Sequence, residues 1–281
     1  MKKVKWSLSI IVFFFLTVVL SYYSIFSVSS TAQLNISRGN LHKNSFQCID
    51  NPKAKSIDKN GKLNVLVWNI YKQSEPNWQQ ELENYTENSS LALLQEVSMD
   101  DEFKAYSQQS NWYSSHVDAF KVFGNSTGVL TLSTSSPLLA CAHIEFEPWL
   151  QLPKSGIYAK FRLSDGRTLV VVNLHSVNFT YGVEEYEKQI TALVAALKKH
   201  QGPIIFAGDL NAWSIERIES IEKIIAKLKL IEVKFNPDNR KQFINGLALD
   251  YVFYRELNLV SAESPISTAS DHNPLLVKFK L

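Results

Sequence analysis

The stretch IIFAGDLNAWS, residues 204–214, joins a run of apolar and small residues to a polar turn. The acid Asp209 and the amide Asn211 stand where the apolar run ends. An ionised carboxylate that is buried without a partner is costly, so a buried strand that ends on an acid predicts that the acid enters a polar site or reaches solvent. Asp and Asn also favour turns and helix caps, so GDLN by itself equally fits an ordinary strand-to-helix turn.

Strands and helices alternate on both sides of this stretch. Two amphipathic helices are predicted beside it, over 183–200 and 215–230, and a third helix over 75–85. Apolar runs predict strands over 63–68, 91–97, 127–133, 137–146, 156–163, 168–175, 247–254 and 273–281. Parallel crossovers mixed with hairpins indicate mixed sheets covered by helices, which is a layered α/β domain.

The N-terminus has the pattern of a membrane segment. Lys2, Lys3 and Lys5 precede an uncharged stretch over 6–26, and about 20 apolar residues suffice to span a bilayer. A cleaved secretory signal usually has an apolar region of only about 7–15 residues, which favours an uncleaved anchor. We therefore divide the chain into a signal anchor or signal peptide over 1–30, a linker over 31–62 and a folded domain over 63–281.

The lysines predict that the N-terminus stays in the cytoplasm and that the domain is extracytoplasmic, on the periplasmic side of the membrane. Secretion after cleavage, or a soluble cytoplasmic protein, are the alternatives. The formal net charge is +2, and three of the lysines lie in the first 30 residues, so the remainder is nearly neutral. This balance argues against a duplex nucleic acid as partner, unless a basic patch is local.

The stretch 31–62 mixes Ser, Asn, Lys and Pro without periodicity, which is the reason to expect a linker there. It contains Cys48, one of only two cysteines, and the other is Cys141. The two could form a disulfide in an oxidising compartment or remain separate thiols.

Polar residues recur at the ends of the predicted strands. The set comprises Asn69, Glu96, His175, Asp209, Asn211, Asp250, Asp271 and His272. Each has an ordinary explanation as a turn former, a structural histidine or a solvated strand end, although Asp250 would be costly as a structural acid within LALDYVFY. The economical solution is that the acids meet around a metal ion. Carboxylate and amide oxygens favour Mg²⁺ or Mn²⁺, and nearby histidines could stabilise or protonate phosphate oxygens.

Six motifs together resemble a known family. NVLVWNIYK, LALLQEV, VVVNLHSVNF, IIFAGDLNAW, LALDYVFY and ASDHNPLLVKF occur in the order and spacing of the endonuclease/exonuclease/phosphatase superfamily. The resemblance covers about 63–281 and is closest to the bacterial YafD-like branch. It implies a four-layer α-β-β-α sandwich, in which two mixed sheets pack face to face with helices outside and a metal-dependent cleft lies at one end.

The resemblance also assigns metal ligands. Glu96 becomes the principal ligand of Mg²⁺ (or Mn²⁺), with Asn69 and Asp271 near the same ion.

The catalytic roles follow from the same motifs. Asp209 would position or deprotonate the attacking water, and Asn211 would hold that water or a phosphate oxygen. His272, oriented by Asp250, would contact the scissile phosphate. His175 takes the position where nuclease members keep a second histidine.

We expect a metal-dependent phosphodiesterase with nuclease-like chemistry, which His175 and GDLNA favour. The alternative is a lipid or inositol phosphate phosphatase or phosphodiesterase, which the N-terminal segment and four aromatic residues favour: Trp149, Phe179, Tyr181 and Trp213. A non-catalytic binding module on the same fold is a third reading. A serine hydrolase finds little support, because the G-x-S-x-G elbow is missing from the sequence. We expect a monomer that contacts the membrane through its N-terminal segment, with Lys154 and Arg167 as further candidates for phosphate contacts.

Overall fold

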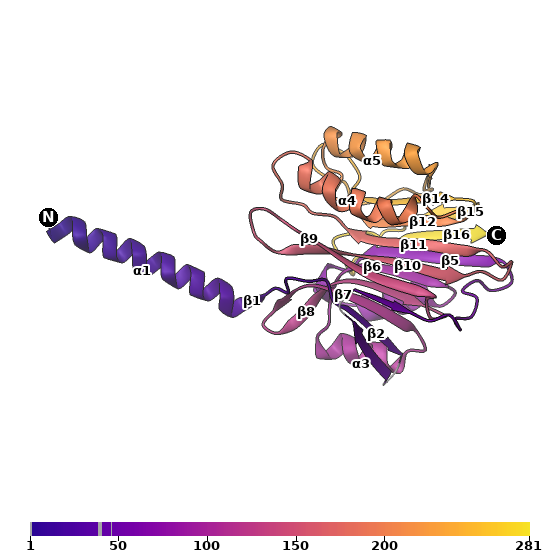
Figure 1. Cartoon of the computed structure of the whole chain (residues 1–281), viewed down its shortest axis with the longest axis horizontal. Helices are drawn as coiled ribbons and strands as arrows, with labels where there is room; N and C mark the ends of the chain where they lie inside the picture. The colour runs from indigo at the N-terminus through magenta and orange to yellow at the C-terminus, as the bar shows by residue number, and fades with distance from the viewer. Residues whose placement is uncertain (1, 39–40, 46) are drawn as a thin grey trace.

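Two β-sheets packed face to face form the body of the protein (Figure 1). The computed structural model describes residues 2–38, 41–45 and 47–281. The nine-stranded sheet has the order β15 (Asn258–Glu263), β16 (Leu275–Lys280), β5 (Lys62–Asn69), β6 (Leu91–Ser98), β8 (Asn125–Ser133), β7 (Tyr113–Val122), β2 (Leu34–Arg38) and β3 (Leu41–Ser45), with β1 (Phe26–Ser27) paired to β7. The seven-stranded sheet has the order β13 (Ile231–Glu232), β14 (Asp250–Arg255), β12 (Ile204–Asp209), β11 (Thr168–His175), β10 (Pro153–Arg162), β9 (Leu139–Phe146) and β4 (Cys48–Asp50).

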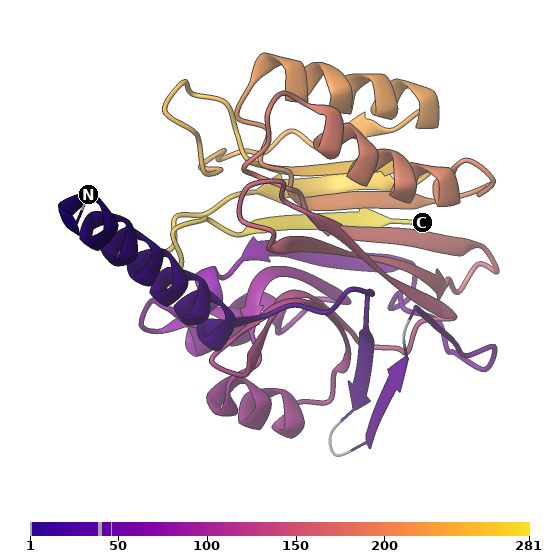
Figure 2. The same cartoon turned by 60° about the vertical axis from the view of Figure 1, so that its left-hand side comes forward.

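Helices cover the outer faces of both sheets (Figure 2). The helices α4 (Glu184–Leu197) and α5 (Ile215–Leu228) pack on the seven-stranded sheet through apolar residues such as Leu193 and Ile221. The helices α2 (Trp78–Thr86) and α3 (Asp101–Gln109) pack on the nine-stranded sheet through Trp78 and Phe103. A third apolar cluster fills the space between the sheets. The expected α/β fold of two mixed sheets flanked by helices is confirmed.

Strand direction brings the polar strand ends to one edge of the sandwich. β5 runs parallel to β6, and β11 runs parallel to β12, so the carboxyl ends of each pair lie together. β14 is antiparallel to β12 and therefore begins at the edge where β12 ends. The register places His175 beside Asp209, and Asp209 beside Asp250. Three of the predicted site residues are thus neighbours across three adjacent strands.

The segment 31–62, expected above to be a linker, is part of the folded body. β2 pairs with β7 in the nine-stranded sheet, and β4 pairs with β9 in the seven-stranded sheet. Leu34 is fully buried, and Cys48 forms a disulfide with Cys141, its direct neighbour across the strands. Short strands at or near the edge of a sheet need only one or two apolar residues each, so the segment has no periodicity that would reveal them. The structure therefore corrects the linker prediction and selects the disulfide from the two alternatives for the cysteines.

The N-terminal helix α1 (Lys2–Ile25) projects away from the folded body (Figure 1). Among the residues described for this chain, no helix is both long enough and apolar enough to cross a membrane. The side chains of 2–9, including the three lysines, lie outside the described ones. The expected transmembrane segment therefore gains no support from the structure.

Candidate active site

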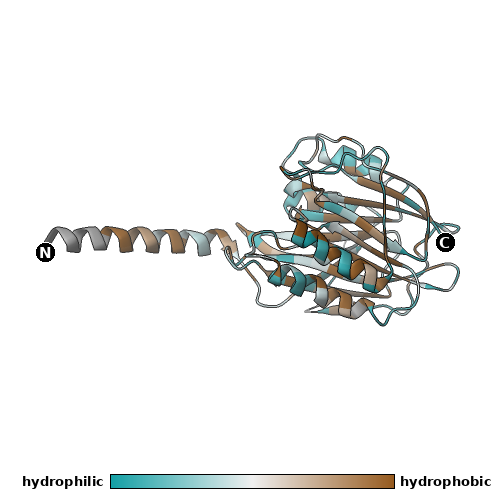
Figure 3. Cartoon of the chain, turned by 90° about the horizontal axis from the view of Figure 1, so that it is seen from above, coloured by the Kyte–Doolittle hydropathy of each residue, from teal (hydrophilic) through white to brown (hydrophobic). Residues whose placement is uncertain are grey.

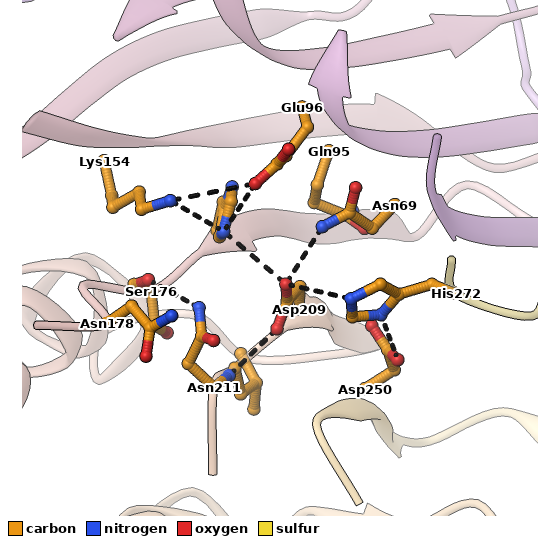
Figure 4. A network of polar contacts seen from close by, with 12 residues as sticks. Asn69, Gln95, Glu96, Lys154, Ser176, Asn178, Asp209, Asn211, Asp250 and His272 are labelled. Carbon is orange, nitrogen blue, oxygen red and sulfur yellow. Dashed lines mark hydrogen bonds and ion pairs between the residues drawn. The ribbon is translucent and has the colours of Figure 1, made fainter. Parts of the chain in front are cut away.

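Asp209 lies at the centre of a network of polar contacts at this edge (Figure 4). Its Oδ2 accepts a hydrogen bond from Asn69 Nδ2 at 3.0 Å, and its Oδ1 accepts one from the backbone N–H of Asn211 at 3.0 Å. His175 Nε2 lies 3.5 Å from Oδ2, and His272 Nε2 lies 3.9 Å from the same oxygen. Asp209 itself is almost fully buried. A buried carboxylate is therefore surrounded by donors from both sheets, which offsets the cost of its burial.

The backbone before and after Asp209 adopts conformations that the sequence GDLN makes possible. Gly208 has φ 138°, and a Cβ built there would lie 1.9 Å from the carbonyl oxygen of Leu174. Only glycine fits this close approach of β11 to β12. Asn211 has φ 45°, a left-handed conformation that asparagine tolerates better than most residues. Its Nδ2 donates to the carbonyl of Ser176, which fixes the side chain beside Asp209.

His272 and Asp250 form a dyad next to Asp209. His272 Nδ1 lies 2.7 Å from Asp250 Oδ2, and both side chains are buried. Burial favours the neutral imidazole, but the adjacent Asp250 carboxylate outweighs it and raises the pKa of His272 to about 10. His272 is therefore an imidazolium at neutral pH, and its Nε2 faces Asp209. The predicted orientation of His272 by Asp250 is present in the structure.

His175, unlike His272, carries no charge at neutral pH. Burial and the nearby Lys154 ammonium lower the pKa of His175 to about 4, so its ring is neutral at pH 7. Lys154 Nζ lies 3.2 Å from His175 Nε2, which fits a neutral ring whose Nε2 accepts from the lysine. The two histidines on either side of Asp209 thus offer different chemistry, one a cation and the other a neutral ring.

Glu96 reaches the site through an irregularity in its strand. The pairing of β6 with β8 shifts register between Leu94 and Val97, and Glu96 has φ 55°. A bulge of this kind re-aims the side chain that follows it. Glu96 forms an ion pair with Lys72 and lies 3.9 Å from Lys154 Nζ.

Burial opposes the charge on Glu96, but its cationic surroundings prevail. His175, Lys154 and Lys72 together lower the pKa of Glu96 to about 2. Since His175 is neutral at pH 7, the two lysines are the cations that count there. Glu96 is therefore an ionised carboxylate throughout the physiological range.

Two predicted residues lie away from these contacts. The Asp271 side chain is 40% exposed and lies 3.7 Å from Lys241 Nζ, and Arg167 bonds to Asp165 and to the carbonyl of Glu256. Within the described part of the chain, the acids and histidines that come within 4.8 Å of one another in a group are Asp209, Asp250 and His272, and no such group contains Glu96 or Asp271. The structure therefore does not join Asp271 to Glu96, and it corrects the suggestion that Arg167 contacts phosphate.

The donor set fits a hard divalent cation. Glu96, Asn69 and Asp209 lie around one part of the network and supply two carboxylates and an amide, whose Nδ2 faces Asp209 and whose Oδ1 accepts from the N–H of Tyr71 (Figure 4). Both cysteines are held in the disulfide, so no thiol enters the site. Oxygen-rich sites of this kind suit Mg²⁺ or Mn²⁺ better than softer metals. Glu96 and Asp209 do not fall into one group within 4.8 Å, which favours separate roles for the two carboxylates.

Several residues of the site were not singled out from the sequence. Lys72 comes from the short 3-10 turn Tyr71–Gln73, in which every residue has positive φ. Nothing in the pattern distinguishes this lysine from a solvated one.

Arg217 is fully buried in α5 and donates to the carbonyls of Asn211 and Asn178. In the sequence, Arg217 looks like an ordinary arginine of an amphipathic helix. Only its contacts reveal that it holds the loop that carries Asn178 against the loop that carries Asn211.

A buried amide pair links the sheets directly beneath the site. Gln95 Nε2 donates to Asn173 Oδ1 at 2.7 Å, and both side chains are fully buried. Asn173 in VVVNLH interrupts an apolar run, and that interruption was the signal available in the sequence.

Comparisons with known proteins identify relatives of this chain. A model for the Endonuclease/Exonuclease/phosphatase family matches residues 66–272. A UPF0294 protein of Vibrio campbellii is 48% identical over 271 residues, which is 96% of each chain. A UPF0294 protein of Photorhabdus laumondii is 40% identical over 223 residues, covering 79% of this chain and 85% of the relative.

Solved structures share the fold at low identity. ANGEL2, a 2′,3′-cyclic phosphatase, superposes with a TM-score of 0.64 at 17% identity, over 82% of this chain and 97% of that one. TDP2 of D. rerio in complex with a single-strand DNA product gives a TM-score of 0.54 at 17% identity, over 78% and 99% of the two chains. At this identity the likeness establishes the fold alone. The UPF0294 relatives confirm the expected placement in the YafD-like branch.

Proposed function

Because the chain belongs to the endonuclease/exonuclease/phosphatase family, we propose that it is a Mg²⁺- or Mn²⁺-dependent hydrolase of phosphate esters, and that phosphodiesters are its preferred substrates. The observation that carries the proposal is the placement of the Asp209 carboxylate between a cationic His272 and a neutral His175. An acid held this way can accept a proton while a neighbouring cation stabilises negative charge.

Glu96 and Asn69 are the residues that would hold the cation. Glu96 is ionised at every physiological pH, and Asn69 would offer its Oδ1, which accepts from the N–H of Tyr71 while its Nδ2 donates to Asp209. When bound, such an ion neutralises phosphate charge and lowers the pKa of a coordinated water. Asp271, paired with Lys241, lacks a comparable position, so we leave it out of the ligand set.

Asp209 acts as the general base in this proposal. It takes a proton from the attacking water, and Asn211, locked by its bonds to Asp209 and Ser176, holds that water or a phosphate oxygen in line. The water oxygen forms a bond to phosphorus, the ester P–O bond breaks, and no covalent enzyme intermediate is required.

His272 stabilises the charge that develops on phosphorus. Its imidazolium, maintained by Asp250, binds a phosphate oxygen and can return a proton to the leaving oxygen. Lys154 and Lys72 add positive charge on the opposite side, next to His175 and Glu96.

We also propose that the folded body lies outside the cytoplasm, attached to the membrane by its N-terminal segment. The Cys48–Cys141 disulfide supports this location, because disulfides persist mainly in oxidising compartments. Fractionation of cells that express the full-length chain tests it, and recovery of the protein in the soluble cytoplasmic fraction would contradict it.

Hydrolysis of bis(p-nitrophenyl) phosphate by the purified chain tests the activity. We expect turnover with Mg²⁺ or Mn²⁺ and none after chelation with EDTA. Asp209→Asn should be inactive, whereas Asp165→Asn, which changes an exposed acid paired with Arg167, should retain full activity. Full activity of Asp209→Asn would refute the proposal. Absence of turnover by the wild-type chain on a broad panel of phosphate esters would favour a non-catalytic binding module.

A further inference from the structure

Large apolar side chains gather unprotected around the edge that carries the site. Tyr181 is 74% exposed, Phe123 is 76% exposed and Ile244 is 97% exposed. Together with Trp149, Leu150 and Phe179, which are also exposed, they form what we call the apolar rim. A cluster of exposed large apolar side chains on a folded protein indicates a surface that contacts another protein or a membrane.

The rim adjoins the catalytic network directly. Trp213 Nε1 donates to Asn178 Oδ1 at 2.8 Å, and the buried Arg217 binds the carbonyls of both Asn178 and Asn211. A cavity of about 350 Å³ opens between Trp149, Phe179 and Trp213, with Asn178 in its wall. The wall of this cavity is therefore joined to Asn211 through Asn178 and Arg217.

The loop that carries Ile244 belongs to the same surface. The Phe243 ring lies 5.9 Å from the Trp213 ring, and Asn245 Nδ2 donates to the carbonyl of Trp213. The rim therefore continues from the β9–β10 loop, past Trp213, to this loop.

The helix α1 leaves the body at the same edge. β6 and β7 are both antiparallel to β8, so their carboxyl ends, which carry Glu96 and Val122, lie at one edge. β1 pairs with Val122 and joins α1 to this point. Tyr22 in the last turns of α1 donates to the carbonyl of Leu150 in the rim, and Ile25 accepts from the N–H of Phe123.

The exposed part of α1 is apolar on all sides. Its side chains from Ile10 to Leu16 are exposed at every consecutive position, so no face of this stretch is covered by the protein. Figure 3 shows this apolar stretch extending clear of the folded body. A helix that is apolar all round is expected in an apolar environment.

We infer that the apolar rim docks on a lipid bilayer surface, with α1 entering the lipid from the same edge, and that the site acts on phosphate esters whose apolar part lies in the bilayer. The substrate half of this inference rests on the proposed hydrolase activity, whereas the docking half does not. The chemistry of the rim favours lipid over a protein partner. Trp149 and Tyr181 are the aromatic types that concentrate at membrane interfaces, Phe179 adds apolar surface, and Lys2, Lys3 and Lys5 precede the apolar stretch.

The docking half is tested by fluorescence of the full-length chain in vesicles of phosphatidylcholine and phosphatidylglycerol. Brominated lipids quench tryptophans that touch the acyl region. The signal that Trp149→Phe removes from the wild-type spectrum should be strongly quenched. Trp112→Phe is the matched control, because Trp112 precedes β7 at the opposite edge, and the signal that it removes should be unquenched. Equal, unquenched signals from both tryptophans would overturn docking.

The substrate half is tested with a triple variant of the rim, Trp149→Ser, Phe179→Ser and Tyr181→Ser. We expect unchanged turnover of soluble bis(p-nitrophenyl) phosphate and about a 10-fold loss of kcat/KM on phosphodiester lipids in the same vesicles. The control pair Ile231→Ser and Val260→Ser, exposed apolar residues outside the rim, should change neither rate.

The outcomes separate the two proposals. Quenching of Trp149 without hydrolysis of any ester would leave docking intact and refute the hydrolase. Hydrolysis of soluble esters with no effect of the triple variant on lipid substrates would refute the substrate half. A wild-type chain that forms a dimer in detergent, and that the triple variant converts to a monomer, would show that a second copy covers the rim and would overturn the inference.

Discussion

The two sheets build their halves of the site in different ways. The seven-stranded sheet aligns His175, Asp209 and Asp250 by regular register across β11, β12 and β14. The nine-stranded sheet delivers Glu96 only through a shift in register and a left-handed backbone, and Lys72 through a turn with three positive φ angles. Regular register gives the proton-transferring half fixed spacing, whereas in the other half a bulge turns the Glu96 carboxylate out of the regular pleat and into the site.

This contrast predicts that the two halves fail differently when a carboxylate is replaced. Asp209→Asn should reduce kcat by about 10³-fold or more, because it removes the general base, and extra metal should not restore it. Glu96→Gln should also lose activity at ordinary Mg²⁺ concentration, but part of it should return as Mg²⁺ or Mn²⁺ is raised, because the change weakens a ligand. Initial rates over a metal titration measure both. Recovery of Asp209→Asn at high metal would mean that the roles are reversed.

The regular half should also be the less tolerant of backbone change. In Gly208→Ala, the new Cβ would meet the carbonyl of Leu174 at 1.9 Å with φ at 138°, so β11 and β12 must separate. We expect a loss of about 3 kcal/mol in the free energy of unfolding, measured with urea. Gly166→Ala is the matched control, since its φ is 88° but no atom lies within 4 Å of the new Cβ. It should lose only about 1 kcal/mol. Equal losses would show that the close approach is unimportant.

The disulfide should contribute to the stability of the seven-stranded sheet. It joins β4 to β9 across a sequence separation of 93, and removing a disulfide typically costs about 2–4 kcal/mol. The double variant Cys48→Ser and Cys141→Ser should lose stability within that range and keep its kcat, because the bridge lies away from Asp209. An unchanged urea midpoint would contradict this expectation.

The charge of His272 should depend on Asp250. Its folded pKa of about 10 lies above the ordinary value of 6.5, so the imidazolium–Asp250 pair stabilises the fold fully below pH 6.5, and this contribution is lost as the pH rises toward 10. In Asp250→Asn, burial is opposed only by the more weakly acting Asp209 and Asp271 carboxylates, and the pKa should fall well below 10. NMR titration of the His272 ring in metal-free protein measures the shift. An unchanged pKa would assign the charge state to another group.

The sequence revealed the residues that violate an apolar pattern. Asp209 and Asp250 end or begin buried strands, where an acid is costly, so both were candidates from the sequence, and the family resemblance supplied their roles. Lys72 and Arg217 carry charges that are ordinary in turns and helices, and only the fold shows where they point. Asp271 sits beside His272 in sequence, but its side chain turns to Lys241, which sequence proximity could not indicate.

Some strands of the fold also could not be predicted from the sequence. β7 was not predicted, because it buries Ser114, Ser115 and His116 and so lacks the alternation that indicates a strand. The strands within 31–62 each bury too few apolar residues to produce a pattern, as Leu34 in β2 and Ile49 in β4 illustrate.

Isotope labelling tests most directly the claim that Asp209 activates water for attack on phosphorus. The full-length chain is incubated with bis(p-nitrophenyl) phosphate in ¹⁸O-enriched water with Mg²⁺, and the products are weighed by mass spectrometry. We predict that ¹⁸O appears in p-nitrophenyl phosphate and not in p-nitrophenol, with the wild-type chain but not with Asp209→Asn. Label in p-nitrophenol, or equal labelling of the phosphate by the variant, would contradict it.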